Sequence, residues 1–513
     1  MSRSVLFGVV SNGSQVATRL VTIPIVIHHL GLDGYGIWNT IMMTASYMRF
    51  GSVGVKTAFQ KYVAESMGNG NYKTASQLLS TGCAMLLGLS VLGLIPAALF
   101  SRAIVVHAGV PPEFQSSAAV AVGLLALIMA VANVGSVFEA IVMGGQRVDL
   151  CRKFNTCLAV IEAVAIVIAM RLGFGLAAMA GIMGLSELIY IVCCYVASKR
   201  IVPEVRVGLG FVTKDVVYEL IRFAGSYQLV NVFEVVYAST LPVIMLRTFG
   251  ANAAGIYALV TRVVASASMI LESFLPPLLS GAAMVYATAS PQRMTDLMRK
   301  AFKVTLVMSL LPLGFISVFG STMTYAWTGQ ADPSFPMVFA LVCFKALVSS
   351  LSLLTLVLYR TSGKAVLDNV RQVIRLGAIV AIAAFASRLG FYGILAAVAA
   401  AELIGLIFML FALGHTFERF SASVVVPDAL KLTAAASLII GVALVASRVT
   451  LPAAFEGRQL ALLSLVQASV VCLLVAYPIA RWTGSVTLEE RSELLSAVLP
   501  KWMSREATES GGA

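Results

Sequence analysis

Three arginines, Arg19, Arg49 and Arg262, lie inside long apolar segments of the sequence. A charged side chain at the centre of a bilayer costs about 2.5–3.5 kcal/mol on insertion scales, so it normally faces water or a charged partner. A guanidinium group presents a planar fork of N–H donors that matches two oxygens of a phosphate. The three arginines therefore predict a cavity that binds an anionic, phosphate-bearing substrate.

Polar side chains accompany the first arginine on one face of its helix. Asn12, Gln15 and Arg19 are separated by three and four residues, the spacing that aligns side chains along an α-helix. Asn231 and Glu234 repeat the first spacing later in the chain. We predict that Asn12, Gln15 and Asn231 line the same cavity as the arginines. The alternative is a seam of hydrogen bonds between helices.

Three further charged residues, Glu234, Glu272 and Lys56, are candidates for coupling or gating. A buried carboxyl group can take up a proton, or it can pair with a buried arginine, and both roles stay open here. The sequence contains neither a phosphate-binding G-x-x-x-x-G-K-[ST] loop nor an H-E-x-x-H zinc motif. We therefore expect no catalytic residue, metal or cofactor, and a protein that is not an enzyme.

The elements that carry these residues are membrane helices. The chain has 513 residues, of which 59% are hydrophobic and 12% charged, whereas soluble domains carry about 25% charged residues. Its apolar runs match the roughly 20 residues that a spanning helix needs. We predict an all-α, polytopic membrane protein with about fourteen transmembrane helices, at 5–27, 36–59, 77–100, 115–143, 153–170, 175–197, 223–246, 254–287, 301–320, 334–358, 372–387, 391–413, 429–447 and 459–480.

The net charge of +12 is explained by topology and not by nucleic-acid binding. Most lysines and arginines, Arg371 and Arg375 among them, fall at the segment ends that share a side with the N-terminus. Because cytoplasmic loops carry the excess of basic residues, both termini are predicted to be cytoplasmic.

The chain also repeats itself. The run Leu30–Trp38 is echoed by Phe249–Tyr257 at an offset of 219, and Arg171–Phe174 by Arg388–Phe391 at 217. Duplications of this size are typical of transporters, with the substrate site between the repeats. We therefore predict two six-helix repeats plus two C-terminal helices. The parts are an N-lobe at 1–200, a cytoplasmic linker at 201–222, a C-lobe at 223–415, peripheral helices at 428–482, and a cytoplasmic tail at 483–513 with a short amphipathic helix.

The first 65 residues resemble the polysaccharide-export flippases of the multidrug/oligosaccharidyl-lipid/polysaccharide flippase superfamily. The likeness rests on Arg19, Pro24 and His29 of the first helix, on Leu30-Gly31 with Tyr35-Gly36-Ile37-Trp38, on Tyr47 and Gly51, and on Gln60-Lys61-Tyr62-Val63-Ala64-Glu65. Arg49 departs from the pattern, because members often carry an acidic residue there.

The resemblance implies two six-helix lobes around a V-shaped cavity. It also implies flipping of a polyprenyl-diphosphate-linked oligosaccharide across the cell inner membrane by alternating access, for surface or exopolysaccharide biosynthesis. The arginines at 19, 49 and 262 would face the cavity. The implied partners are the lipid-linked oligosaccharide, membrane lipids, and the polysaccharide polymerase and export machinery.

Two other functions remain to be weighed. A cation-coupled multidrug-type exporter of small organic molecules is disfavoured by the buried arginines and by fourteen helices where twelve are usual. A membrane-embedded glycan polymerase or ligase would need a sizeable outer loop, and the predicted loops are short.

Overall fold

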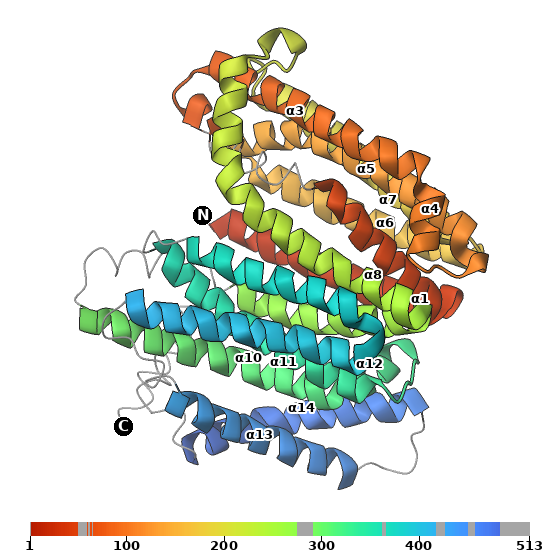
Figure 1. The fold of residues 1–513 in the computed structure, drawn as a ribbon, viewed down its shortest axis with the longest axis vertical. Coiled ribbons are helices and arrows are strands. Elements are labelled where there is room, and N and C mark those ends of the chain that lie inside the picture. Colours follow the sequence, from red (N-terminus) through yellow and green to blue (C-terminus); the bar gives the residue numbers. More distant parts are fainter. Residues whose placement is uncertain are drawn as a thin grey trace. The chain divides into compact units, whose positions relative to one another are not determined.

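The computed structural model is built from helices throughout the part of the chain that it describes, which is residues 2–49, 59, 62–63, 65–273, 291–361, 366–416, 426–449 and 457–482 (Figure 1). The α-helices are α1 (Ser2–Ala45), α3 (Tyr72–Leu99), α4 (Ser101–His107), α5 (Pro112–Gly144), α6 (Val148–Arg171), α7 (Leu176–Ile201), α8 (Lys214–Ser273), α10 (Pro291–Thr328), α11 (Phe335–Thr361), α12 (Val366–Thr416), α13 (Val426–Val449) and α14 (Gly457–Trp482). Two short 3-10 helices, η1 (Ser46–Arg49) and η2 (Leu209–Phe211), complete the order.

Eleven of these helices are long and apolar enough to cross a membrane. The prediction of an all-α polytopic membrane protein is therefore confirmed. Three of the eleven, α1, α8 and α12, are interrupted by a glycine with non-helical backbone angles and so carry two predicted segments each, in whole or in part. Each of the fourteen predicted segments overlaps one of the eleven helices, and the predicted segment 36–59 continues past α1 into η1. Helix α4 was not predicted.

The interruptions occur at Gly31 (φ 71°, ψ 175°), Gly250 (φ 86°, ψ −180°) and Gly390 (φ 70°, ψ 171°). This backbone region is essentially restricted to glycine, because a Cβ atom would clash with the neighbouring peptide groups. Positive φ angles recur at offsets close to that of the repeat: Gly31 matches Gly250 at 219, Gly109 matches Gly329 at 220, and Gly173 matches Gly390 at 217. The duplication seen in the sequence is thus present in the backbone conformation.

A close helix contact also follows the repeat. The helix after Gly31 crosses the helix after Gly250, and a Cβ atom on Gly36 would overlap the backbone of Gly255 and of Ala251. A Cβ atom on Gly255 would overlap the carbonyl of Leu32. The two overlaps are equivalent in the repeat, because Gly255 follows Gly36 by 219 residues and Ala251 follows Leu32 by 219 residues. The contact is therefore self-complementary, as in a twofold interface. Both helix segments start at the same end, so the twofold axis runs along them, as in parallel repeats.

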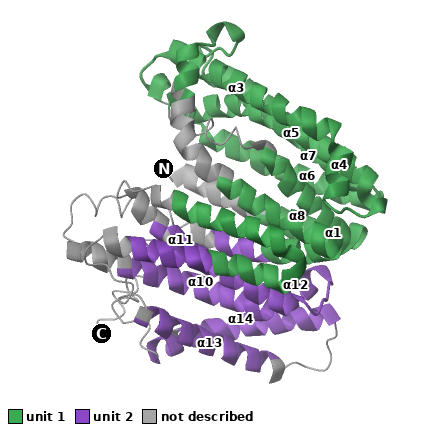
Figure 2. Cartoon of the chain, in the orientation of Figure 1, with its two compact units in different colours: residues 1–262, 368–401 green, residues 263–367, 402–513 purple. Residues whose placement is uncertain are grey.

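The chain divides into two compact units, which Figure 2 shows in different colours. Unit 1 comprises residues 1–262 and 368–401, and unit 2 comprises 263–367 and 402–513. These units do not coincide with the two predicted lobes, whose boundaries stay a prediction. The tail helix predicted after residue 483 lies outside the described residues.

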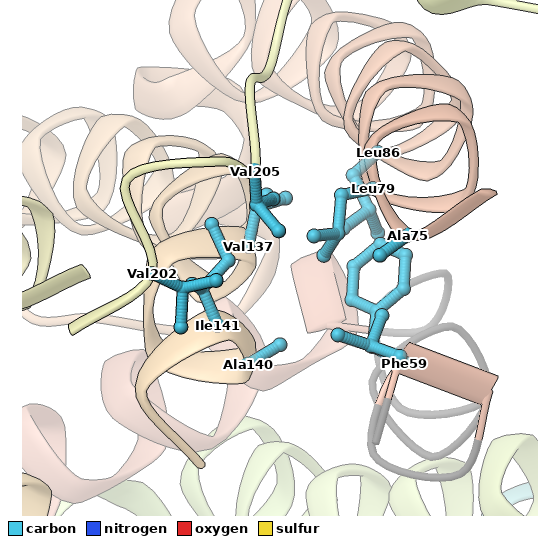
Figure 3. Close-up of a cluster of buried hydrophobic side chains, with 10 residues drawn as sticks. Phe59, Ala75, Leu79, Leu86, Val137, Ala140, Ile141, Val202 and Val205 are labelled. Atoms are coloured by element: carbon cyan, nitrogen blue, oxygen red, sulfur yellow. The ribbon is translucent and has the colours of Figure 1, made fainter. Parts of the chain in front are cut away.

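The predicted linker at 201–222 is fastened to α3. Three side-chain hydroxyl groups of α3, those of Ser76, Ser80 and Thr81, accept hydrogen bonds of 3.0–3.2 Å from linker backbone N–H groups. Val202 and Val205 are buried with side chains of α3 and α5 and with Phe59 (Figure 3). The start of the linker is therefore part of the packed core of unit 1.

Candidate functional site

The structure brings two of the predicted arginines together. Arg19 lies on the first part of α1 and Arg262 on the second part of α8, and their guanidinium groups interact electrostatically with each other and with the Tyr35 hydroxyl. Arg19 is exposed, Arg262 is half-buried, and Tyr35 is buried. We call Arg19 and Arg262 the arginine pair.

The depth of the arginine pair follows from the glycine breaks. Arg19 precedes Gly31 by twelve residues, and Arg262 follows Gly250 by twelve. At about 1.5 Å per residue, both Cα atoms lie about 18 Å from their breaks. The two breaks are neighbours, because Gly36 and Gly255 touch. Each break joins two predicted spanning segments, so we expect it at a membrane surface. In a hydrocarbon layer about 30 Å thick, that position of the breaks puts the arginine pair inside the membrane.

A second group of polar residues joins α8 to α12 within unit 1. Arg375 donates hydrogen bonds to both carboxylate oxygens of Glu234, from Nη1 to Oε2 at 2.7 Å and from Nη2 to Oε1 at 3.4 Å. Gln372 donates to Glu234 Oε2 at 3.1 Å and accepts from Arg375 Nη1 at 2.9 Å. We call Glu234, Tyr237, Arg371, Gln372 and Arg375 the carboxylate cluster.

The two partners of this ion pair differ in exposure. The Arg375 side chain is 4% exposed, whereas the Glu234 side chain is 51% exposed. The Arg375 guanidinium carbon lies 3.9 Å from the centre of the buried Tyr237 ring, which adds a cation–π contact. Arg371 is buried beside the ion pair and interacts electrostatically with Glu234. In the cluster, the half-exposed carboxylate of Glu234 is therefore held by the buried guanidinium group of Arg375, with the buried Arg371 nearby.

The structure adds the burial of Arg371 and Arg375 to what the sequence predicts. Their position at the cytoplasmic ends of segments stays a prediction, and both side chains are buried on α12. Glu234 and Gln372 accept hydrogen bonds from the two terminal nitrogens of Arg375, which offset part of the cost of its burial. A signal was available: Arg371 and Arg375 are four residues apart, on one face of a helix that begins before the predicted segment.

The remaining candidates are placed only by their backbone or not at all. Asn12, Gln15, Arg49, Asn231 and Glu272 belong to α1, η1 and α8, but their side chains lie outside the described part of the structure. Lys56 is not among the described residues. Glu234 pairs with Arg375, which matches the structural alternative for this residue. Within the described ranges, no three histidine, cysteine, aspartate or glutamate residues are grouped to hold a metal ion.

No protein-family model matches the sequence, and no curated protein sequence matches it. Similarity appears among solved structures. The lipid II flippase MurJ in an inward closed conformation aligns over 93% of this chain and 99% of its own, with 13% identity and a TM-score of 0.67. An inward-facing multidrug-resistance transporter of the MATE family aligns over 80% and 96%, with 15% identity and a TM-score of 0.65.

A third similar structure is a transporter from Pyrococcus furiosus with a binding pocket of reversed polarity. It aligns over 81% of this chain and 95% of its own, with 15% identity and a TM-score of 0.57. At these identities the likeness concerns the fold. The chain has the fold of the multidrug/oligosaccharidyl-lipid/polysaccharide flippase superfamily, which confirms the resemblance at that level.

Proposed function

We propose that this chain, whose fold is that of the multidrug/oligosaccharidyl-lipid/polysaccharide flippase superfamily, is a flippase for a polyprenyl-diphosphate-linked oligosaccharide. In this proposal it is a transport protein of the cell inner membrane, with both termini cytoplasmic. It serves surface or exopolysaccharide biosynthesis together with a polysaccharide polymerase and export machinery. The lipid tail stays among membrane lipids while the diphosphate and glycan cross by alternating access.

The observation that carries this proposal is the arginine pair. Two guanidinium groups held within electrostatic range of each other repel, and the repulsion is stronger in a low-dielectric region than in water. A bound anion relieves it and gains charge-assisted hydrogen bonds from both forks. Arg19 is exposed well inside the membrane, where lipid contact is unfavourable, so it faces water when no substrate is present. A diphosphate supplies the required charge and oxygens.

The alternative is a cation-coupled multidrug-type exporter, since the MATE transporter shares the fold equally well. A site for organic cations needs carboxylates that are available to the substrate. Here Glu234 is already paired with Arg375, and the arginine pair adds positive charge. The similar transporter with a pocket of reversed polarity indicates that this fold accommodates sites of different charge. The charge of the described site therefore favours an anionic substrate.

The test is complementation of surface-glycan export in cells that lack this chain, with the amount of membrane-inserted protein measured alongside. Loss of a charge-assisted hydrogen bond costs roughly 1.5–3 kcal/mol, so Arg19→Ala and Arg262→Ala should each reduce export at least about tenfold. Arg19→Lys and Arg262→Lys keep the charge but lose the fork, and should reduce export less.

Arg171→Ala is the matched control, because Arg171 is an exposed arginine in the last turn of α6 and should leave export unchanged. Normal export by both alanine variants at normal protein levels would contradict the proposal. Export of organic cations by the unchanged chain, with no effect on surface glycan when the chain is deleted, would favour the multidrug alternative.

A further inference from the structure

We infer that Glu234 is a substrate-binding residue whose carboxylate accepts hydrogen bonds from the sugar hydroxyl groups next to the diphosphate. This inference rests on the proposed function and extends it from the charged to the uncharged part of the substrate. In this inference Gln372 and Arg375 are positioning residues, which hold the carboxylate through hydrogen bonds and do not contact the substrate.

The first step is the remaining acceptor capacity of Glu234. An ionised carboxylate offers about four lone-pair positions. Oε2 accepts two hydrogen bonds, at 2.7 and 3.1 Å, while Oε1 accepts one long bond of 3.4 Å from Arg375. Half of the side chain is exposed. Oε1 therefore retains an acceptor position on the accessible side of the residue.

The second step is the rigidity of the support. Gln372 bridges Glu234 and Arg375, and the Tyr237 ring packs against the guanidinium group. These contacts fix the orientation of the carboxylate before any ligand binds. A preorganised acceptor loses less side-chain entropy on binding than a mobile one.

The third step is the charge, which selects the class of ligand. Arg375 neutralises Glu234, and Arg371 lies within electrostatic range of the same carboxylate. A second cation, whether a coupling ion or an organic cation, therefore gains little from this carboxylate. A hydroxyl group donates a hydrogen bond without bringing charge, and sugars present many of them. The cluster therefore suits the neutral glycan better than a cation.

The fourth step is the depth of the cluster in unit 1. Glu234 precedes Gly250 by sixteen residues and Arg375 precedes Gly390 by fifteen, which places their Cα atoms about 24 and 22 Å from their breaks. The breaks are neighbours, since Phe249 and Phe391 have ring centroids 5.7 Å apart. Measured along the helix axes, the carboxylate cluster therefore lies about 4–6 Å farther from the breaks than the arginine pair, a separation of about one sugar ring.

The experiment measures binding by the purified full-length chain of two lipids. One is the lipid-linked oligosaccharide extracted from cells that lack this chain, and the other is the matching bare polyprenyl diphosphate. Glu234→Gln keeps the shape of the side chain but replaces one carboxylate oxygen by a donor. It should weaken binding of the glycan-bearing lipid about tenfold and leave binding of the bare lipid unchanged. Arg375→Lys should change the same ratio, but less.

A charge-reversed double variant, Glu234→Arg with Arg375→Glu, separates a ligand contact from a purely structural ion pair. It restores the ion pair but presents a guanidinium group where the carboxylate was. We expect a thermal unfolding midpoint near that of the unchanged protein, with glycan discrimination still lost. Recovery of discrimination together with stability would overturn the inference.

Three results of the binding measurement overturn the inference in different ways. If Glu234→Gln binds both lipids as the unchanged protein does, Glu234 does not contact the glycan, and the proposed function stands. Tetraphenylphosphonium, an organic cation, is measured as a third ligand. If Glu234→Gln weakens its binding, the carboxylate binds a cation and not the glycan. Failure of the unchanged protein to bind either lipid would remove the proposed function and this inference with it.

Discussion

The arginine pair and the carboxylate cluster both place charged side chains on the predicted membrane helices of unit 1, but the charges have different neighbours. In the pair, Arg19 and Arg262 lie within electrostatic range of each other. In the cluster, a carboxylate on α8 offsets a buried arginine on α12, and Gln372 satisfies further hydrogen bonds. An ion pair holds its two partners together, whereas two like charges held near each other favour the binding of an anion between them. The two regions should therefore respond oppositely to loss of charge.

The largest loss of stability should come from Glu234→Ala. This change leaves the buried Arg375 without its carboxylate, and breaking a buried ion pair costs about 3–5 kcal/mol of stability. Arg375→Ala should cost less, about 1–3 kcal/mol, because the half-exposed Glu234 can be solvated by water. Thermal unfolding in detergent compares the two. Equal losses, or a larger loss for Arg375→Ala, would show that the exposures of the two partners do not set the cost.

The next effect on stability concerns the close contact between Gly36 and Gly255, which makes the breaks at Gly31 and Gly250 neighbours. Gly36→Ala places a Cβ atom against the backbone of Gly255 and Ala251, which cannot move aside as a side chain can. Overpacking of this kind costs about 1–3 kcal/mol. Gly255→Ala should cost a similar amount, because it makes the equivalent overlap with Leu32.

Gly181→Ala is the control for this measurement, since Gly181 lies inside α7 and nothing approaches its missing Cβ within 4 Å. It should raise stability by up to about 1 kcal/mol, as alanine is favoured over glycine in a helix. If all three alanine variants behave alike, the close contact of the two repeats is not present in the membrane.

A smaller loss is expected for Gln372→Ala. The amide group of Gln372 makes one hydrogen bond to each member of the ion pair, but the pair itself remains. We expect a loss of about 1 kcal/mol in the free energy of unfolding. A double-mutant cycle with Glu234→Gln measures the coupling between the two side chains. Additive losses in that cycle would indicate that the amide does not support the carboxylate.

The smallest effect on stability should come from Arg19→Ala. Removal of one member of a like-charged pair should leave the free energy of unfolding unchanged, or raise it by less than about 1 kcal/mol. Glycan export should nevertheless fall strongly, so stability and transport separate in this variant. A clear loss of stability would place Arg19 with the structural charges, and the contrast between the two regions would fail.

The sequence predicts more of the fold than of the site. Helix positions follow from long apolar runs, and the repeat follows from Gly31 and Gly250, because only glycine suits those backbone angles. The identity of charge partners is harder to predict, since Glu234 and Arg375 are 141 residues apart. Arg375 lies at the boundary of an apolar run, where composition alone cannot distinguish a cytoplasmic end from a buried one. The burial of Arg375 depends on Glu234 and Tyr237, which belong to another helix and lie far away in the sequence.

The self-complementary contact of Gly36 and Gly255 has a consequence for the history of the chain. Before a gene duplication, such a contact would join two identical polypeptides, and any mutation would act on it twice. Once both copies are on one chain, each side can change alone. Leu32 and Ala251 are equivalent by position and already differ, while Gly36 and Gly255 are still identical. The two glycines are therefore a part of the contact that is the same in both copies, while the positions they touch differ.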